Sequence, residues 1–351
     1  MQRYRRQRNF GCRIHDQYSY FGMRTLVLEN EKLRLSLLLD KGGEIFECLY
    51  KPLDLDLIWL SENGVQNPMD YLSTSADPTA AFIDYYPGGW QEVLPNGGPT
   101  ASYLGAQYGQ HGEVAHMPWD YDIIKDTPEE IEVKLSVRTK KIPFHVSKTF
   151  ILTSGSSQIQ VKEQLKNLGT TNLHYMWGHH LVFGKPFALP GSNIGLPNGV
   201  EIITESKDSE VAAPGRIVRG ETYYWPQADT EDGSLDLSIL PERDTRSDII
   251  YLTNFGQNGW YTLENLNLYL GVKVEWDSTQ FPYLWYWQEF GGTKTYPWYG
   301  RHYNVGLEPF SSYPTHGLEE AIRNGSAAEI APCEIKSFWM KLTPYIPKPK
   351  T

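Results

Sequence analysis

The strongest constraint on the fold is a period of two in hydrophobicity that recurs from one end of the chain to the other. Every second position of residues 33–39 is a leucine, and Arg34 and Ser36 lie between them. The same alternation recurs in residues 131–137 and 266–274. Successive side chains of a β-strand point to opposite faces, so each run places apolar side chains on one face of a half-buried strand. The chain is therefore predicted to consist mainly of strands.

Glycine-rich turn signals separate these runs, and helical periodicity is almost absent. Turns are expected at residues 41–43, 97–99 and 198–199. The best helix candidate is GLEEAIRNG, residues 317–325, because it ends in Asn-Gly. Many antiparallel strands without long helices indicate a sandwich or a barrel. Because no repeat or linker divides the chain, we predict one domain over residues 1–351: an all-β, large antiparallel β-sandwich with one or two short helices.

Charge and cysteine content exclude several classes of partner. The formal net charge of −10 opposes binding to a nucleic-acid backbone. No apolar run approaches the roughly 18 residues of a membrane helix, and the basic residues 3–8 are not followed by the apolar core of a signal peptide. Cys12, Cys48 and Cys333 are few and far apart, which fits a reducing cytoplasm better than a disulfide framework. We expect a cytoplasmic monomer or homodimer without a nucleic-acid or membrane partner.

Aromatic residues are abundant, with 11 Trp and 23 Tyr. Such rings stack on the C–H faces of pyranoses and would suit a sugar-binding cleft, but aromatic residues also favour strands. Stacking and core packing are therefore both open for Trp90, Trp119, Trp285 and Trp287. The long loops around residues 60–110 and 184–230 are rich in Gly, Pro and Asn, and loops of this kind on a β-scaffold commonly carry a binding site.

Two adjacent histidines stand in the stretch YMWGHHLVFG, residues 175–184. Neighbouring side chains of a strand point to opposite faces, so His179 and His180 are not expected to bind one metal ion together. The sequence also contains no H-E-x-x-H motif and no cysteine pair, so no metal is expected. Alternation alone does not decide which of the two histidines faces a cleft.

Two other titratable residues stand in apolar or aromatic surroundings, His111 in YGQHGEVAHMPWD and Glu308 in RHYNVGLEPFSSYP. A carboxylate in a hydrophobic strand needs a partner or a function, because burying it unpaired is costly. A glycosidase would need a second carboxylate, for which Glu92 or Glu289 could serve. No G-x-S-x-G elbow and no G-x-G-x-x-G motif occurs, so neither a serine nucleophile nor a nucleotide cofactor is indicated.

The order of three motifs, H-G in a loop, then H-x-x-F, then G-L-E, resembles the aldose 1-epimerases (galactose mutarotases) and their broader superfamily. The resemblance covers most of the chain and implies a large antiparallel β-sandwich, a small-molecule sugar as partner, and no cofactor. It implies that Glu308 and His180 are catalytic and that His111 and Asp248 hold ring hydroxyls. Further residues are expected to line the sugar pocket: His179, Trp90, Glu92 and Trp287.

The resemblance implies ring opening by two proton transfers, in which Glu308 takes the proton of the anomeric hydroxyl and His180 protonates the ring oxygen. The arginine that the family places ahead of its first histidine has no clear match here, so the sugar stays open. Two other functions remain open at this point. They are a non-catalytic carbohydrate-binding protein on the same scaffold and a polysaccharide hydrolase or lyase.

Overall fold

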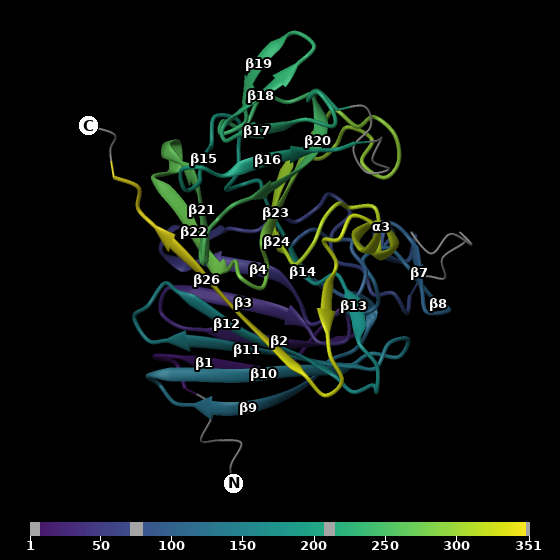
Figure 1. Cartoon of the computed structure of the whole chain (residues 1–351). Coiled ribbons are helices and arrows are strands. Elements are labelled where there is room, and N and C mark those ends of the chain that lie inside the picture. The colour runs from purple at the N-terminus through teal and green to yellow at the C-terminus, as the bar shows by residue number, and fades with distance from the viewer. Residues whose placement is uncertain (1–7, 71–79, 207–214, 349–351) are drawn as a thin grey trace.

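Antiparallel strands dominate the computed structural model, which describes residues 8–70, 80–206 and 215–348 (Figure 1). Strands account for about 51% of the structure and helices for about 6%. The prediction of an all-β sandwich with one or two short helices is therefore confirmed. The α-helices among the described residues are α2 (Ala80–Ile83) and α3 (Leu318–Arg323), and α3 lies within the predicted segment. Among the described residues, no helix has the length and hydropathy of a membrane-spanning segment.

The larger sheet contains twelve strands and takes strands from both halves of the chain. In spatial order these are β1 (Arg13–Tyr20), β2 (Met23–Glu29), β3 (Leu33–Leu38), β4 (Glu44–Tyr50), β6 (Trp90–Val93), β14 (Gly178–Gly184), β24 (Asn304–Phe310), β23 (Tyr283–Phe290), β20 (Thr245–Thr253), β16 (Glu201–Thr204) and β17 (Thr222–Tyr224), with β5 (Leu55–Asp56) paired to β4.

The second sheet contains eight strands. In spatial order these are β15 (Asn193–Gly195), β21 (Asn258–Asn265), β22 (Leu270–Asp277), β26 (Ile335–Tyr345), β12 (Ile159–Asn167), β11 (Phe144–Thr153), β10 (Glu130–Arg138) and β9 (Asp120–Asp126). Smaller elements are the pairs β7 (Ala101–Tyr103) with β8 (Ala106–Tyr108), β13 (Leu173–Tyr175) with β25 (Ala328–Ile330), and β18 (Gln227–Thr230) with β19 (Gly233–Asp236), and the 3-10 turns η1 (Lys51–Leu53), η2 (Val114–His116) and η3 (Leu266–Leu268).

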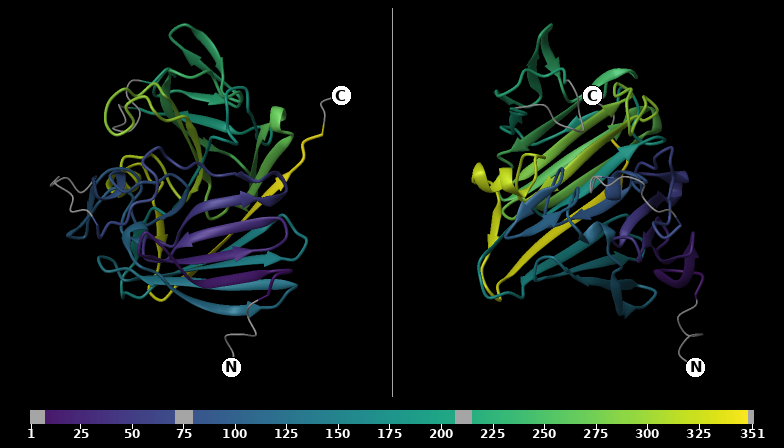
Figure 2. Two further views of the ribbon diagram at one scale, coloured as in Figure 1. Left: turned by 180° about the vertical axis from the view of Figure 1, so that it is seen from behind. Right: turned by 90° about the vertical axis from the view of Figure 1, so that its right-hand side faces the viewer.

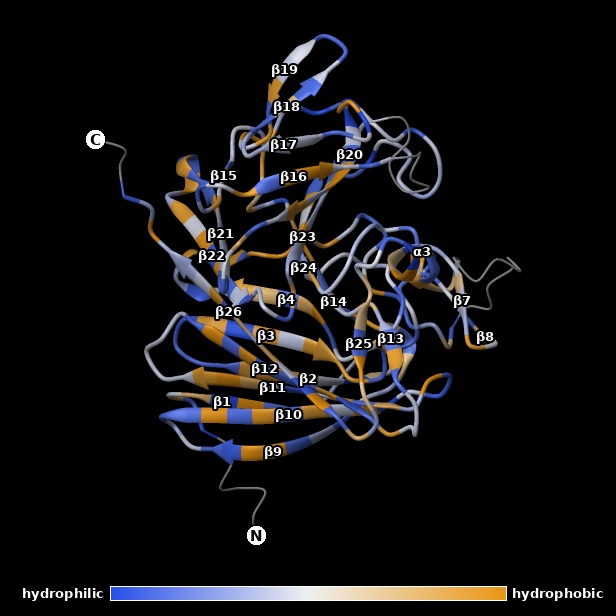
Figure 3. Cartoon of the chain, in the orientation of Figure 1, coloured by the Kyte–Doolittle hydropathy of each residue, from blue (hydrophilic) through white to orange (hydrophobic). Residues whose placement is uncertain are grey.

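The two large sheets pack face to face (Figure 2) and enclose the main hydrophobic core. Leu35 and Leu37 of β3 and Val133 and Leu135 of β10 belong to the same buried cluster. Buried and partly exposed residues alternate along β10, and the hydropathy colouring of this strand alternates in the same way (Figure 3). Burying one such side chain contributes about 1.5–3 kcal/mol, so the alternation specifies which face of each strand turns inward.

The predicted strand over residues 266–274 is wrong in its first part. Residues 266–268 form the turn η3, and the strand β22 begins only at Leu270. The side chain of Asn265 accepts hydrogen bonds from the backbone N–H groups of Asn267 and Leu268, and Tyr269 adopts a left-handed conformation. This side-chain cap closes the turn between β21 and β22, which a period of two in leucines does not reveal.

The central strands β14, β23 and β24 are buried on both faces. Their inner faces contribute Leu181 and Leu307 to the main core. Their outer faces contribute Val182, Trp287 and Phe310 to a second hydrophobic cluster, which includes residues of α2 and its flanking loops. A layer of helix and loops thus covers the middle of the large sheet from outside, and the candidate site lies beneath this layer.

Candidate active site

The strand β14 separates the two adjacent histidines, as alternation predicts. His179 points into the core between the two sheets and is fully buried, whereas His180 points to the outer face of the large sheet. There His180 packs against the rings of Tyr86 and Trp287, with centroid distances of 5.1 and 5.7 Å. The histidine that faces a pocket is therefore His180.

Strand register brings His180 beside Glu308. The pairs Gly178–Phe310 and Val182–Gly306 of β14 and β24 place these two residues opposite each other on neighbouring strands. Side chains of opposite residues in an antiparallel pair lie on the same face. The distance between His180 Nδ1 and Glu308 Oε1 is 3.5 Å.

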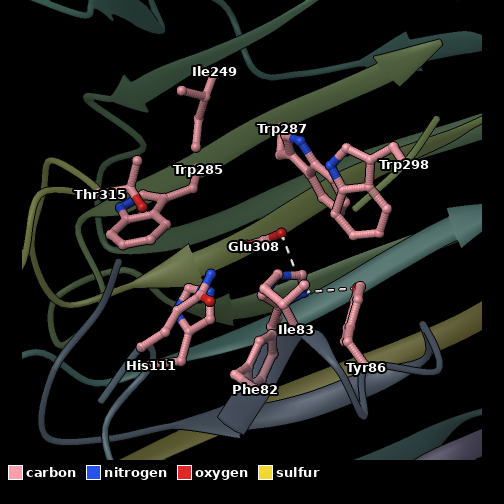
Figure 4. Close-up of a pocket in the computed structure, with 12 residues that line it drawn as sticks. Phe82, Ile83, Tyr86, His111, Ile249, Trp285, Trp287, Trp298, Glu308 and Thr315 are labelled. Atoms are coloured by element: carbon pink, nitrogen blue, oxygen red, sulfur yellow. Dashed lines mark hydrogen bonds and ion pairs between the residues drawn. The ribbon is translucent and has the colours of Figure 1, made fainter. Parts of the chain in front are cut away.

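A pocket surrounds this pair, and its volume is about 410 Å³ when the space open to solvent at its mouth is included. In Figure 4, Glu308 lies between Trp285 on one side and Trp287 with Trp298 on the other, and Phe82 and His111 face it across the pocket. The lining residues are Phe82, Ile83, Tyr86, Gln110, His111, His180, Ile249, Trp285, Trp287, Trp298, Glu308 and Thr315.

His111 reaches the pocket from a tight turn. Its backbone is left-handed, with φ of 59°, and Gly112 follows with φ of 82°. A side chain at position 112 would collide with the backbone carbonyl of Leu94, which explains the glycine of the H-G motif. The backbone N–H of Gly98 donates to His111 Nδ1 at 3.2 Å, and burial lowers the pKa of His111 well below its usual value. His111 is therefore a neutral imidazole with its proton on Nε2.

Burial controls the charge of the central pair. It raises the pKa of Glu308 well above the ordinary value of a carboxyl group and lowers the pKa of His180 to about 3. Burial thus favours the pair of a carboxylic acid and a neutral imidazole over the charged pair. Such a pair holds one proton to donate and one lone pair to accept a proton, which is what acid–base catalysis requires.

Three buried polar atoms of the pocket have no hydrogen-bond partner among the described residues: Glu308 Oε1, Gln110 Oε1 and Trp287 Nε1. Most buried polar atoms in proteins are paired, so an unpaired set in one pocket points to partners on a bound molecule. A carboxyl oxygen, an amide oxygen and an indole N–H of this kind match the hydroxyl groups of a sugar, and the surrounding rings match its C–H faces.

The predicted sugar contacts of Trp90, Glu92 and His179 need correction, because these side chains lie on the opposite face of the sheet. Trp90 Nε1 donates to His179 Nδ1 at 2.9 Å, and His179 Nε2 lies 3.1 Å from Glu163 Oε2. An indole N–H only donates, so His179 Nδ1 is the acceptor and Nε2 carries the proton. Glu92 accepts hydrogen bonds from Trp177 Nε1 and from Lys148 Nζ, the latter at 3.0 Å.

This core network also contains the one group of described residues whose geometry could suit a metal ion, namely Glu92, Glu163 and His179. The ammonium group of Lys148 already supplies a cation beside Glu92, and both ring nitrogens of His179 are engaged. We therefore interpret the group as a buried ion network. The pocket on the other face contains a single carboxylate, Glu308, among its described lining residues.

Asp248 is also placed away from the pocket. Its neighbour Ile249 lines the pocket, so alternation along β20 turns Asp248 to the other face. There the carboxylate accepts from the backbone N–H of Arg216 at 2.7 Å and from Arg216 Nε at 2.6 Å. The prediction that Asp248 holds a ring hydroxyl is corrected accordingly. Glu289 is likewise engaged, with Ser247 Oγ and Thr293 Oγ1 each donating to its Oε2 at 2.5 Å.

The structure thus brings together His111, His180, Trp287 and Glu308 of the predicted set. Sequence reasoning did not single out several other lining residues. Of these, Phe82, Ile83, Tyr86 and Gln110 lie in or beside the loop at residues 60–110 that was predicted to carry a site. No sequence signal marked Ile249, Trp298 or Thr315.

Comparison with protein families gave one model, described as a domain of unknown function (DUF4432), which matches residues 21–343. Comparison with curated protein sequences gave no match.

Solved structures share the fold at low sequence identity. A proposed aldose 1-epimerase from Klebsiella pneumoniae is 15% identical, with a TM-score of 0.73 over 95% of this chain and 82% of that one. A galactose mutarotase-like protein from Clostridium acetobutylicum is 13% identical, with a TM-score of 0.65 over 96% and 99%. A galactose mutarotase related enzyme from Lactobacillus acidophilus is 15% identical, with a TM-score of 0.59 over 92% and 97%. The fold is therefore that of the galactose mutarotase-like proteins.

Proposed function

The chain belongs to the DUF4432 family, whose description assigns no activity, and we propose that it is an aldose 1-epimerase-like isomerase. It would interconvert the α and β anomers of a free sugar or sugar derivative. The observation that carries this proposal is the acid–base pair of His180 and Glu308, 3.5 Å apart in an aromatic-lined pocket. The shared fold supports the same class of reaction.

The reaction needs one proton donor and one proton acceptor. In ring opening, neutral His180 accepts the proton of the anomeric hydroxyl while the carboxylic acid of Glu308 protonates the ring oxygen. The C1–O5 bond breaks, the free aldehyde forms, and rotation about C1–C2 exposes its other face. In ring closure O5 attacks C1, the O5 proton returns to Glu308, and the His180 proton returns to the anomeric oxygen. Each group acts once as an acid and once as a base, so no proton is consumed.

This direction of transfer is the reverse of the assignment expected from the sequence, in which Glu308 is the first base. The reason is burial, which favours the uncharged forms of both groups in the pocket. We further propose that Gln110, His111 and Trp287 hold the ring hydroxyls. Trp285 and Trp298 would pack on the C–H faces of the sugar.

The direct test is exchange between anomers over a panel of aldoses, followed by NMR exchange spectroscopy and by polarimetry from a freshly dissolved single anomer. At least one sugar is expected to equilibrate faster with the protein than in matched buffer. If no sugar of a broad panel is accelerated, the isomerase proposal fails. Tight binding without anomer exchange would favour the carbohydrate-binding alternative, which the absence of Asp248 from the pocket also favours.

A broad pH plateau is expected for kcat/KM. The active pair holds one proton, so activity falls only where His180 gains a second proton or Glu308 loses its own. The first event has a pKa of about 3, and the second has a pKa well above that of an ordinary carboxyl group. Anomerisation rates corrected for the buffer reaction should therefore stay level as the pH rises through the ordinary carboxyl range, about 4.3, and should fall only above it. A bell-shaped pH profile of kcat/KM, limited by the ordinary pKa values of about 4.3 and 6.5, would contradict the buried neutral pair.

Replacing Gly306 with alanine is expected to lower activity while the protein still folds. A Cβ at this position would lie well inside van der Waals contact with Glu308 Oε1, whereas the glycine leaves room for the carboxyl group. Gly306→Ala should displace Glu308 and lower kcat by about tenfold or more, since a catalytic group 1 Å out of place can cost about 10²-fold. The rate of anomer exchange and the melting temperature would be measured together.

The matched control is Gly195→Ala in β15. There too a Cβ would press on a single polar side-chain atom, Thr262 Oγ1, but far from the pocket in the other sheet. Both variants should lose similar, small amounts of stability, and only Gly306→Ala should lose activity. Equal activities in the two variants would contradict the placement of Glu308.

A further inference from the structure

Resting on the function proposed above, we infer that Tyr86 is a positioning residue that binds His180 Nδ1 and leaves Nε2 as the nitrogen that exchanges protons with the sugar. Tyr86 Oη lies 3.2 Å from His180 Nδ1, and both side chains are buried. Glu308 Oε1 lies 3.5 Å from the same nitrogen. Two oxygen atoms therefore face Nδ1 from different elements of the fold.

The chemistry of the ring decides what this contact does. A neutral imidazole has one N–H donor and one acceptor nitrogen, and the imidazolium ion has two donors. For neutral His180 to accept the sugar proton at Nε2, its own proton must be on Nδ1, where Tyr86 Oη is in reach as the acceptor. After the transfer, Nδ1–H still donates to Tyr86, and the carboxylate left on Glu308 faces the new imidazolium ion. One hydroxyl group thus serves both protonation states of His180.

The ring of Tyr86 is held firmly enough for this role. It stacks on Phe82 with a centroid distance of 5.2 Å and packs edge-on or tilted against Trp59 and Trp298 at 6.0 and 6.1 Å. Two residues further on, the backbone at Gly88 packs directly against the backbone carbonyl of Trp59, and a side chain at position 88 would collide with it. A hydroxyl group on a ring fixed in this way orients the imidazole with little loss of precision.

The test is Tyr86→Phe, which keeps the ring and removes only the hydroxyl group. We expect kcat to fall by about 10–100-fold, because a catalytic group about 1 Å out of place can cost about 10²-fold, with a smaller change in KM. The independent readout is the ring ¹⁵N spectrum of the ligand-free protein, in which the His180 signals are identified by their loss in His180→Asn. The parent protein should show the proton on Nδ1, and Tyr86→Phe should shift the population toward Nε2–H.

Tyr286→Phe is the matched control. Tyr286 is also buried, and its Oη donates to the backbone carbonyl of Leu237 at 3.0 Å, on the other face of the sheet. This variant should lose some stability but keep the kcat and the His180 spectrum of the parent.

The outcomes separate the two claims. If the parent protein accelerates no sugar, the isomerase proposal fails, and the His180 spectrum still decides whether Tyr86 sets the tautomer. If the parent is active and Glu308→Gln is not, while Tyr86→Phe matches the parent in both kcat and tautomer, only the role of Tyr86 fails. A parent spectrum with the proton on Nε2 would also overturn the inference.

Discussion

Glu308→Gln should slow anomer exchange by about 10²–10⁴-fold while the protein stays folded, because one proton-transfer group is typically worth that much in rate. Burial raises the pKa of Glu308 and so favours its neutral carboxyl form, and a neutral amide has nearly the same shape. The amide can form hydrogen bonds to a sugar but cannot give up or take a proton in the same step. The loss should therefore appear in kcat, with KM changed less.

The measurement is the rate of anomer exchange on every sugar that the parent protein accelerates, with the melting temperature taken beside it. Glu289→Gln is the matched control, since Glu289 is a fully buried carboxylate on the neighbouring strand whose oxygens are bound by Ser247 and Thr293. It should keep the parent kcat. If Glu308→Gln were as fast as the parent on every such sugar, Glu308 would not be a proton-transfer group.

The largest effect on stability is expected from the ion network on the inner face of the large sheet. Glu92→Gln should lower the free energy of unfolding by about 3–5 kcal/mol, because it leaves the ammonium group of Lys148 buried without its carboxylate. Although burial opposes ionisation, Lys148 holds the pKa of Glu92 below its usual value, so the native carboxylate is charged. Urea unfolding at pH 7 measures the loss.

Glu163→Gln in the same network should have the opposite effect, raising the free energy of unfolding. Burial and the nearby charge of Glu92 raise the pKa of Glu163 to about 6 from an ordinary value of 4.5. The folded state therefore binds the proton more tightly than the unfolded state. The stability that this proton provides is complete below about pH 4.5 and is lost as the pH rises through about 6. At pH 7 the glutamine should thus raise the free energy of unfolding by about 1–2 kcal/mol.

The two isosteric substitutions, a few ångströms apart, test the charge assignment against simple loss of packing. Near pH 4.5 the gain from Glu163→Gln should disappear, whereas the loss from Glu92→Gln should remain. Equal destabilisation by both variants at pH 7 would show that Glu163 carries a compensated charge and that the network is assigned wrongly.

Part of the candidate site followed from the sequence, because alternation is a local property and because three motifs resemble those of the aldose 1-epimerases. Alternation separated His179 from His180, and the H-x-x-F and G-L-E motifs selected His180 and Glu308, which the structure places together. Four predicted contacts lie on the other face, and three of them, Trp90, Glu92 and His179, failed for one reason. Trp90 and Glu92 of β6 pair with β14 so that their side chains share the face of His179. The register between the two strands cannot be predicted from either segment alone.

The sequence by itself determined the strand class, the short helix α3 in outline, and the opposite directions of the two histidines, since each depends on the spacing of neighbouring residues. Only the tertiary structure decided which face of β14 is a pocket and which is core. Both faces of the central strands are covered, one by the second sheet and one by α2 and its loops. Because both faces are buried, the sequence of these strands does not show which face borders the pocket. The pocket residues Tyr86, Gln110 and Trp298 likewise come from segments that meet only when the layers pack. Contacts between distant segments produce no periodic pattern in the sequence, so they could not be predicted.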